Sequence, residues 1–159
     1  MPQNDPLDGA IVSFINYGTG TALDLSEGSS RNETPIIGYK FHGHTNQQWR
    51  LQRVDSSTVW PTWKLINVAS ATVVDLYGGG SNNGNPIIGQ VNQADNMNQL
   101  WYLVSADPLG RVVKIQNIRT GTYVNLLDGS VADGTKVTGY AGSVQDKNSH
   151  QLWRVLHIN

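Results

Sequence analysis

Apolar positions along the chain fall in short runs rather than at helical spacing. The runs L-I-N-V (65–68) and T-V-V-D-L (72–76) are rich in β-branched residues, and a turn-like A-S-A separates them. Two further apolar runs follow, P-I-I-G-Q (86–90) and Q-L-W-Y-L-V (99–104). Gly, Asn and Asp interrupt the pattern every few residues, and no window shows a convincing helical period. The pattern predicts four short strands and an all-β chain.

The four-strand pattern occurs three times. Gln-x-Trp appears in N-Q-Q-W-R-L (46–51), N-Q-L-W-Y-L (98–103) and H-Q-L-W-R-V (150–155), so the three tryptophans are 52 residues apart. Matching columns of residues stand upstream of each one. These columns are Asn16, Asn67 and Asn117; Asp24, Asp75 and Asn125; and Gly38, Gly89 and Gly139. The distance from the Gly column to the Gln varies, which predicts a loop of variable length there.

Three repeats predict a single domain with internal threefold symmetry. They cover approximately residues 11–54, 62–106 and 111–158 of one domain, 1–159, and the connectors are too short to be interdomain linkers. A four-strand unit cannot bury its apolar face alone, whereas three units around one axis can close a barrel. We therefore expect twelve strands, with the Gln-x-Trp tryptophans in one core and the Asn column bonded to turn backbone.

Composition limits the classes of binding partner and the cellular compartments that are expected for this chain. Charged residues are 14% of the chain and its formal net charge is −1, so neither nucleic acid nor an anionic membrane surface is expected as a partner. The absence of Cys excludes disulfides and a thiol nucleophile. The N-terminus lacks a signal-peptide core, and no apolar run approaches the ~20 residues of a membrane helix. A cytoplasmic chain, or one released without a signal peptide, is expected.

Three repeats that each end in Gln-x-Trp resemble the ricin B-chain type of β-trefoil lectin, most of all the small cysteine-free lectins of mushrooms. The resemblance covers residues 12–158. It implies a shallow sugar site in each repeat, made of an Asp after the second strand, an aromatic on the next strand and an Asn before the Gln. It also implies binding of terminal galactose or N-acetylgalactosamine, a defensive role, and no enzymatic activity, cofactor or metal.

Repeat one carries the complete set. A carboxylate accepts from two neighbouring hydroxyls, an amide both donates and accepts, and an aromatic ring covers the C–H face of galactose. A Gly in the turn could leave the carboxylate facing outward, and a His adds a wall or a donor. The expected sugar-binding residues are Asp24, Gly28, Tyr39, His42, Asn46 and Gln47.

The other repeats depart from this set. Repeat two keeps Asp75 and Asn98 but has Gln90 in place of the aromatic. A weaker second site of Asp75, Asn92 and Asn98 is expected, with Asn92 or Tyr77 in place of the ring. Repeat three keeps an aromatic, Tyr140, but has Asn125 for Asp and His150 for Asn. The third site is expected to be silent or altered.

Plainer roles for these residues remain open. Asp24 and Asp75 also suit hydrogen bonds from turn N–H groups, and Gln47 suits bonds to loop backbone. His42 and His44 form an H-x-H pair that could hold a metal from one face of a strand, but no third ligand stands nearby.

Functions other than a lectin also remain open. A protein-binding trefoil, such as a protease inhibitor, is the main alternative, and no catalytic motif supports an enzyme. Trp60 and Trp63 in V-W-P-T-W cover the barrel or mark a dimer surface. A homodimer would pair single weak sites and raise avidity.

Overall fold

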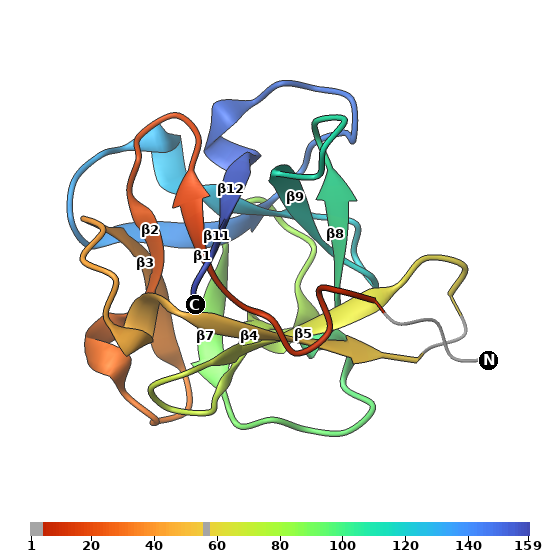
Figure 1. Cartoon of the computed structure of the whole chain (residues 1–159), viewed down its shortest axis with the longest axis horizontal. Helices are drawn as coiled ribbons and strands as arrows, with labels where there is room; N and C mark the ends of the chain where they lie inside the picture. The colour runs from red at the N-terminus through yellow and green to blue at the C-terminus, as the bar shows by residue number, and fades with distance from the viewer. Residues whose placement is uncertain (1–4, 56–57) are drawn as a thin grey trace.

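The computed structural model describes residues 5–55 and 58–159, which form twelve strands and six short 3₁₀ turns (Figure 1). The strands are β1 (Ile11–Asn16), β2 (Ala22–Leu25), β3 (Thr34–Tyr39), β4 (Trp49–Val54), β5 (Thr62–Asn67), β6 (Val73–Leu76), β7 (Asn85–Gln90), β8 (Trp101–Ser105), β9 (Val112–Asn117), β10 (Tyr123–Leu126), β11 (Thr135–Tyr140) and β12 (Trp153–His157). The turns are η1 (Ser26–Gly28), η2 (Thr45–Gln47), η3 (Tyr77–Gly79), η4 (Met97–Gln99), η5 (Leu127–Gly129) and η6 (Ser149–Gln151). No helix in this part of the chain is long and apolar enough to cross a membrane.

The first and fourth strands of each repeat close a six-stranded barrel. β1 pairs with β12 and β4, β5 with β4 and β8, and β9 with β8 and β12, all antiparallel. The second and third strands form the hairpins β2–β3, β6–β7 and β10–β11, and the third strands pair with one another around the axis. A barrel capped by three hairpins is a β-trefoil, so the predicted fold is confirmed.

The Gln-x-Trp tryptophans fill the core as predicted. Trp49, Trp101 and Trp153 are completely buried, and each indole Nε1 donates to a backbone carbonyl in the second strand of its own repeat, at 3.0–3.1 Å. Large aromatic rings at equivalent places fill the three thirds of one core, and the bonded Nε1–H leaves no buried donor unpaired.

The Asn column joins the repeats to one another. Asn16 Oδ1 accepts from backbone N–H groups of its own turn, and its Nδ2 donates to the carbonyl of Ser149 at 3.1 Å. Asn67 donates in the same way to the carbonyl of Asn46 at 3.0 Å, and Asn117 to the 3₁₀ turn of repeat two. Each Asn therefore fixes its own turn and ties it to the Gln-x-Trp turn of the repeat before it.

Buried lysines anchor the longer versions of the variable loop. Lys114 is fully buried, and its ammonium pairs with the carboxylate of Asp146 in the loop before η6. At the equivalent position of repeat two, Lys64 Nζ donates to Asn92 Oδ1. Repeat one has the shortest loop and carries Ser13 at this position. A buried ammonium needs such partners to offset its lost hydration.

Candidate functional site

Asp24 lies near the end of β2, where the chain enters η1, and it is only 2% exposed. Its Oδ1 accepts from Asn46 Nδ2 at 3.1 Å, and its Oδ2 accepts from Gln47 Nε2 at 2.8 Å. The Asn-Gln pair ahead of Trp49 thus holds a carboxylate that comes from another strand. Each carboxylate oxygen can accept more than one hydrogen bond, so both retain capacity for a ligand.

Burial raises the pKa of the Asp24 carboxyl above its ordinary value, because desolvation disfavours the charged form. Hydrogen bonds from Gln47 and Asn46 and the proximity of His42 lower this pKa but do not cancel the shift. The hydrogen bonds from the protein therefore do not fully replace the hydration that the carboxylate loses on burial. A ligand that brought hydroxyl donors would stabilise it.

Tyr39, at the end of β3, and His42 form an aromatic wall beside Asp24. Their ring centroids are 5.9 Å apart, with the planes at 62°. The backbone N–H of His44 donates to His42 Nδ1 at 3.0 Å, which assigns the hydrogen of the neutral ring to Nε2. That Nε2 lies 3.8 Å from Asp24 Oδ2. Tyr39 is 37% exposed, so its ring is accessible from solvent.

These groups line one hollow of about 580 Å³ in repeat one. Five of the six residues predicted for this site line it, namely Asp24, Gly28, Tyr39, His42 and Asn46. Gly28 has a φ of 63°, and a Cβ there would lie 3.3 Å from the Cβ of Asn46. A Gly at this point lets the turn adopt a left-handed conformation while the amide packs closely beneath it.

Gln47 differs from the expectation of a direct sugar contact. It is completely buried behind Asp24, outside the wall of the hollow. Its Nε2 also donates to the carbonyl of Lys40 at 3.0 Å, and its Oε1 accepts from the N–H of His42 at 3.0 Å. Gln47 therefore positions the carboxylate and the loop, which is the plainer role left open by the sequence.

The hollow has six further lining residues that the sequence did not predict for it, namely Ser26, Glu27, Ile37, His44, Thr45 and Ala69. His44 lies with its ring centroid 4.4 Å from that of His42, and Ala69 comes from the first turn of repeat two. The sequence indicated His44 only as half of an H-x-H pair that lacked a third metal ligand nearby. No group of three metal-binding side chains occurs in residues 5–55 and 58–159. Ala69 reaches the hollow only because repeat two packs against repeat one.

Repeat two holds its carboxylate in a similar way. Gln99 Nε2 donates to Asp75 Oδ2 at 2.9 Å, and burial raises the pKa of Asp75 as it does that of Asp24. Among the described residues the side-chain donor to Asp75 is Gln99, so Asn98 does not take the role of Asn46, and its own Oδ1 is buried without a hydrogen-bond partner. A Cβ at Gly79 would lie 2.6 Å from that oxygen, so the amide packs directly against the turn.

The expected substitutes for the missing ring of repeat two lie elsewhere. Asn92 Oδ1 accepts from Lys64 Nζ, and Gln90 Oε1 accepts from a backbone N–H of repeat one at 3.0 Å. Tyr77 lines a different hollow, between β3, β7 and β11 of the cap. The Asn92 amide is thus bonded to the buried ammonium of Lys64, and its place in a second site with Asp75 and Asn98 stays a prediction.

Repeat three keeps the hydrogen bond from the Gln of Gln-x-Trp but has other side chains at the Asp and Asn positions. Asn125 Oδ1 accepts from Gln151 Nε2 at 3.2 Å, and Tyr140 is 39% exposed. The His150 ring packs onto Gly129, where a Cβ would lie 2.5 Å from its Nε2. The repeat thus retains an exposed ring, has an amide instead of a carboxylate at the Asp column, and has an imidazole in the place of the Asn46 amide.

Comparison with known proteins identifies related folds. A family model described as Ricin-type beta-trefoil lectin domain-like matches residues 4–90 and 61–140. None of the curated protein sequences compared with the chain matches it. The Rhizoctonia solani agglutinin has a similar structure, with a TM-score of 0.79 and 26% identity over 99% of this chain and 100% of that one.

Two other solved structures are similar. The designed threefold-symmetric protein ThreeFoil has a TM-score of 0.82 and 26% identity, over 93% of this chain and 99% of its own. The ricin B-like lectin of Macrolepiota procera, solved in complex with lactose, has a TM-score of 0.73 and 22% identity, over 97% of this chain and 98% of its own. With the family match covering most of the sequence, this chain belongs to the ricin-type β-trefoil lectin family.

Proposed function

We propose that the chain is a non-enzymatic lectin that binds glycans ending in galactose or N-acetylgalactosamine through the hollow of repeat one. The observation that carries the proposal is the meeting of four kinds of group at this hollow. They are the Asp24 carboxylate, the Asn46 amide, the His42 imidazole and the exposed ring of Tyr39. No such combination occurs at Asp75 or Asn125.

The chemistry of galactose suits these groups. Its axial 4-hydroxyl lies beside the 3-hydroxyl, so one carboxylate can accept from both, and such charged hydrogen bonds contribute roughly 1.5–3 kcal/mol each. His42 Nε2–H supplies a donor at the edge of the hollow. Tyr39 offers a face for the largely C–H side of the sugar. The lactose bound to the Macrolepiota procera lectin supports the choice of ligand class.

One site per chain follows from the differences among repeats. The third strand of repeat two ends in Gln90 instead of an aromatic residue, and repeat three has Asn125 at the Asp column and His150 packed onto Gly129. Calorimetric titration with lactose should therefore give a stoichiometry of one sugar per chain.

The test is a glycan array probed with labelled protein, with and without excess lactose. Binding to glycans that end in galactose or N-acetylgalactosamine, abolished by lactose, supports the proposal. A blank array at high protein concentration, or binding that lactose does not reduce, overturns it. Protease-inhibition assays would then test the protein-binding alternative, which free sugar should not affect.

A further inference from the structure

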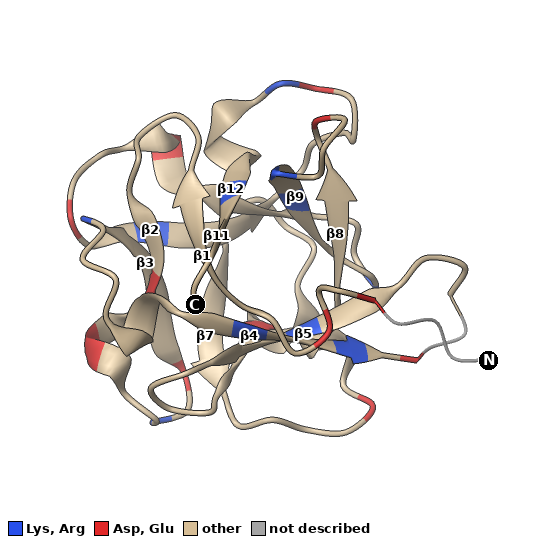
Figure 2. Ribbon diagram, in the orientation of Figure 1, with Lys and Arg blue, Asp and Glu red and all other residues tan. Residues whose placement is uncertain are grey.

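A second hollow, of about 700 Å³, lies between β5, β8 and the loop before β12. Its walls include Trp60, Pro61, Trp63, Tyr102, Val104 and Val144. Leu103, Ser105 and Gln116 complete the lining, so none of its lining residues is charged. Figure 2 shows β8 free of charged residues along its length, whereas β4 and β12 each carry basic positions. None of these residues takes part in the hollow of repeat one.

The internal symmetry shows what the fold requires at these positions. In each repeat the fourth strand begins with the core tryptophan and pairs in the same register with a first strand. The residue after that tryptophan is Tyr102 in β8, but it is Arg50 in β4 and Arg154 in β12. Three residues further along, β8 has Ser105 where β4 has Arg53. Repeat two has thus replaced outward charges by uncharged groups.

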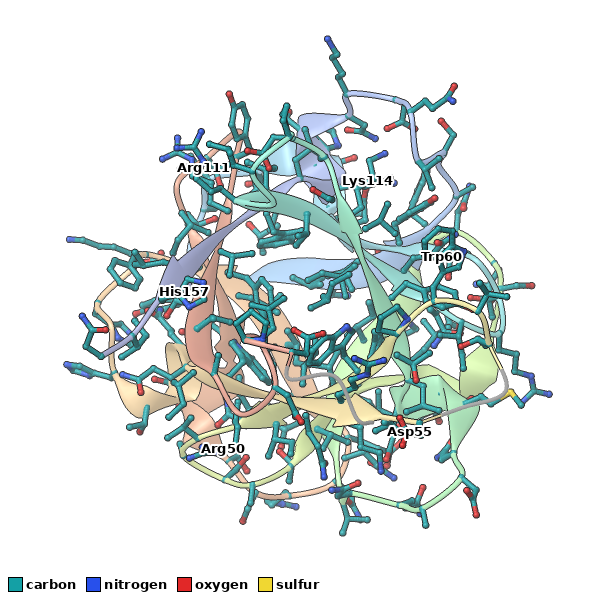
Figure 3. All side chains as sticks on the ribbon, turned by 45° about the vertical axis from the view of Figure 1, so that its right-hand side comes forward. Arg50, Asp55, Trp60, Arg111, Lys114 and His157 are labelled. Atoms are coloured by element: carbon teal, nitrogen blue, oxygen red, sulfur yellow. The ribbon has the colours of Figure 1, made fainter. Side chains whose placement is uncertain are left out.

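Trp60 is another uncharged group that repeat two carries and the other repeats lack. It stands seven residues before Asn67, and the residues at this distance before Asn16 and Asn117 are Gly9 and Gly110, which differ from it in having a positive φ. Its indole is 70% exposed and projects at the surface (Figure 3). A side chain so exposed contributes little to packing. An exposed indole beside an uncharged hollow is typical of a binding surface.

We propose that this hollow binds a small uncharged ligand with a flat aromatic or aliphatic body and one hydrogen-bonding group. The volume lies within the range of about 300–1,000 Å³ that is usual for small-molecule sites. Trp60 and Tyr102 offer ring surface, and the Gln116 amide and the Tyr102 hydroxyl offer the polar contacts.

The same lining disfavours other ligand classes. A charged ligand would lose hydration without a compensating charge in the wall. A free sugar would leave most of its hydroxyls without partners, because the wall has few polar groups.

The probe is prodan, an uncharged naphthalene ketone whose fluorescence shifts to the blue in apolar sites. Titration of the whole chain should give saturable binding of one probe per chain. Trp60→Gly and Tyr102→Arg should each weaken it by about tenfold or more, a loss near 1.4 kcal/mol. Tyr102→Arg copies the residue that the other repeats carry at the same strand position, and Trp60 is 70% exposed, so circular dichroism and melting should show an intact fold in both variants.

Matched controls separate this site from the sugar site. Tyr39→Ala should leave prodan binding unchanged, and Trp60→Gly should leave lactose binding unchanged. Absence of saturable prodan binding, binding that survives both variants, or displacement by lactose would each overturn the proposal. Sedimentation of the native chain and Trp60→Gly tests another occupant: a dimer that the substitution dissociates would assign the hollow to a second copy and also overturn it.

Discussion

Repeats one and three carry the same tryptophan anchor but different polar groups around it. In both, a Gln from the 3₁₀ turn donates to the side chain at the Asp column, and in both the third strand ends in an exposed Tyr. Repeat one has a carboxylate, Asp24, held by Asn46, whereas repeat three has Asn125 and a His150 that packs onto Gly129. The Gln and the Trp maintain the fold, so the neighbouring positions can gain or lose a ligand site without disturbing it.

The loops before the two turns differ as well. Repeat three has a longer loop, and the buried Lys114 holds it through Asp146. Repeat one has a short loop whose backbone is tied by Gln47, which leaves His42 beside the hollow. The short loop of repeat one leaves a side chain at the hollow, whereas the longer loop of repeat three is anchored by a buried lysine.

The largest expected effect tests what the two repeats share. Trp49→Ala and Trp153→Ala should each lower the free energy of unfolding by about 3–5 kcal/mol, because each removes a fully buried indole. Urea denaturation measures both. Trp60→Ala is the exposed control and should change stability by less than about 0.5 kcal/mol. A clearly smaller loss at one of the two core positions would contradict their equivalence.

The next largest effect is expected at the Asp column, where repeats one and three differ. Asp24→Asn should weaken lactose binding by about tenfold to 150-fold, the loss of one charged hydrogen bond of roughly 1.5–3 kcal/mol. The matched change, Asn125→Asp, should add no second site, because His150 still packs onto Gly129. Calorimetry measures both affinity and stoichiometry. Two sugars per chain in Asn125→Asp would show that the carboxylate alone makes the site.

A smaller effect is expected from the two exposed rings. Tyr39→Ala should weaken lactose binding by about two- to tenfold, in line with an aromatic contact of roughly 0.5–1.5 kcal/mol. Tyr140→Ala removes an equally exposed ring from repeat three and should leave the affinity unchanged. Equal losses from the two variants would mean that both repeats bind sugar.

The smallest effect concerns pH. Because burial raises the pKa of Asp24 above 3.8, lactose binding should begin to fall at a higher pH than it would for an ordinary aspartate. The folded chain holds this proton more tightly than the unfolded chain, so the raised pKa contributes stability at low pH. That contribution is lost as pH rises through the folded pKa.

Asp24→Asn lacks this titration. The native chain should therefore lose stability relative to Asp24→Asn as pH rises from below the unfolded pKa to neutrality. Urea denaturation of both chains across this range gives the difference. Parallel stability curves would show that the Asp24 pKa is not raised by folding.

Much of the site was predictable because the sequence contains its own alignment. Three copies of the pattern defined the columns, the resemblance to ricin B-type lectins assigned roles to them, and only repeat one fills all of Asp24, Tyr39 and Asn46. Asn98 has the same residue type as Asn46, yet its oxygen is buried against Gly79. Residue identity could not reveal that orientation, because it depends on how closely two turns approach.

The sequence by itself determined the β-trefoil, the buried tryptophans and the residue columns around the candidate site, because all three follow from a repeated local pattern. Only the tertiary structure decided that Asn92 accepts a hydrogen bond from Lys64 and that Ala69 lines the hollow of repeat one. It also decided that Trp60 and Tyr102 share an uncharged hollow. These contacts join residues of different strands and loops, and the barrel's closure around its axis brings them together.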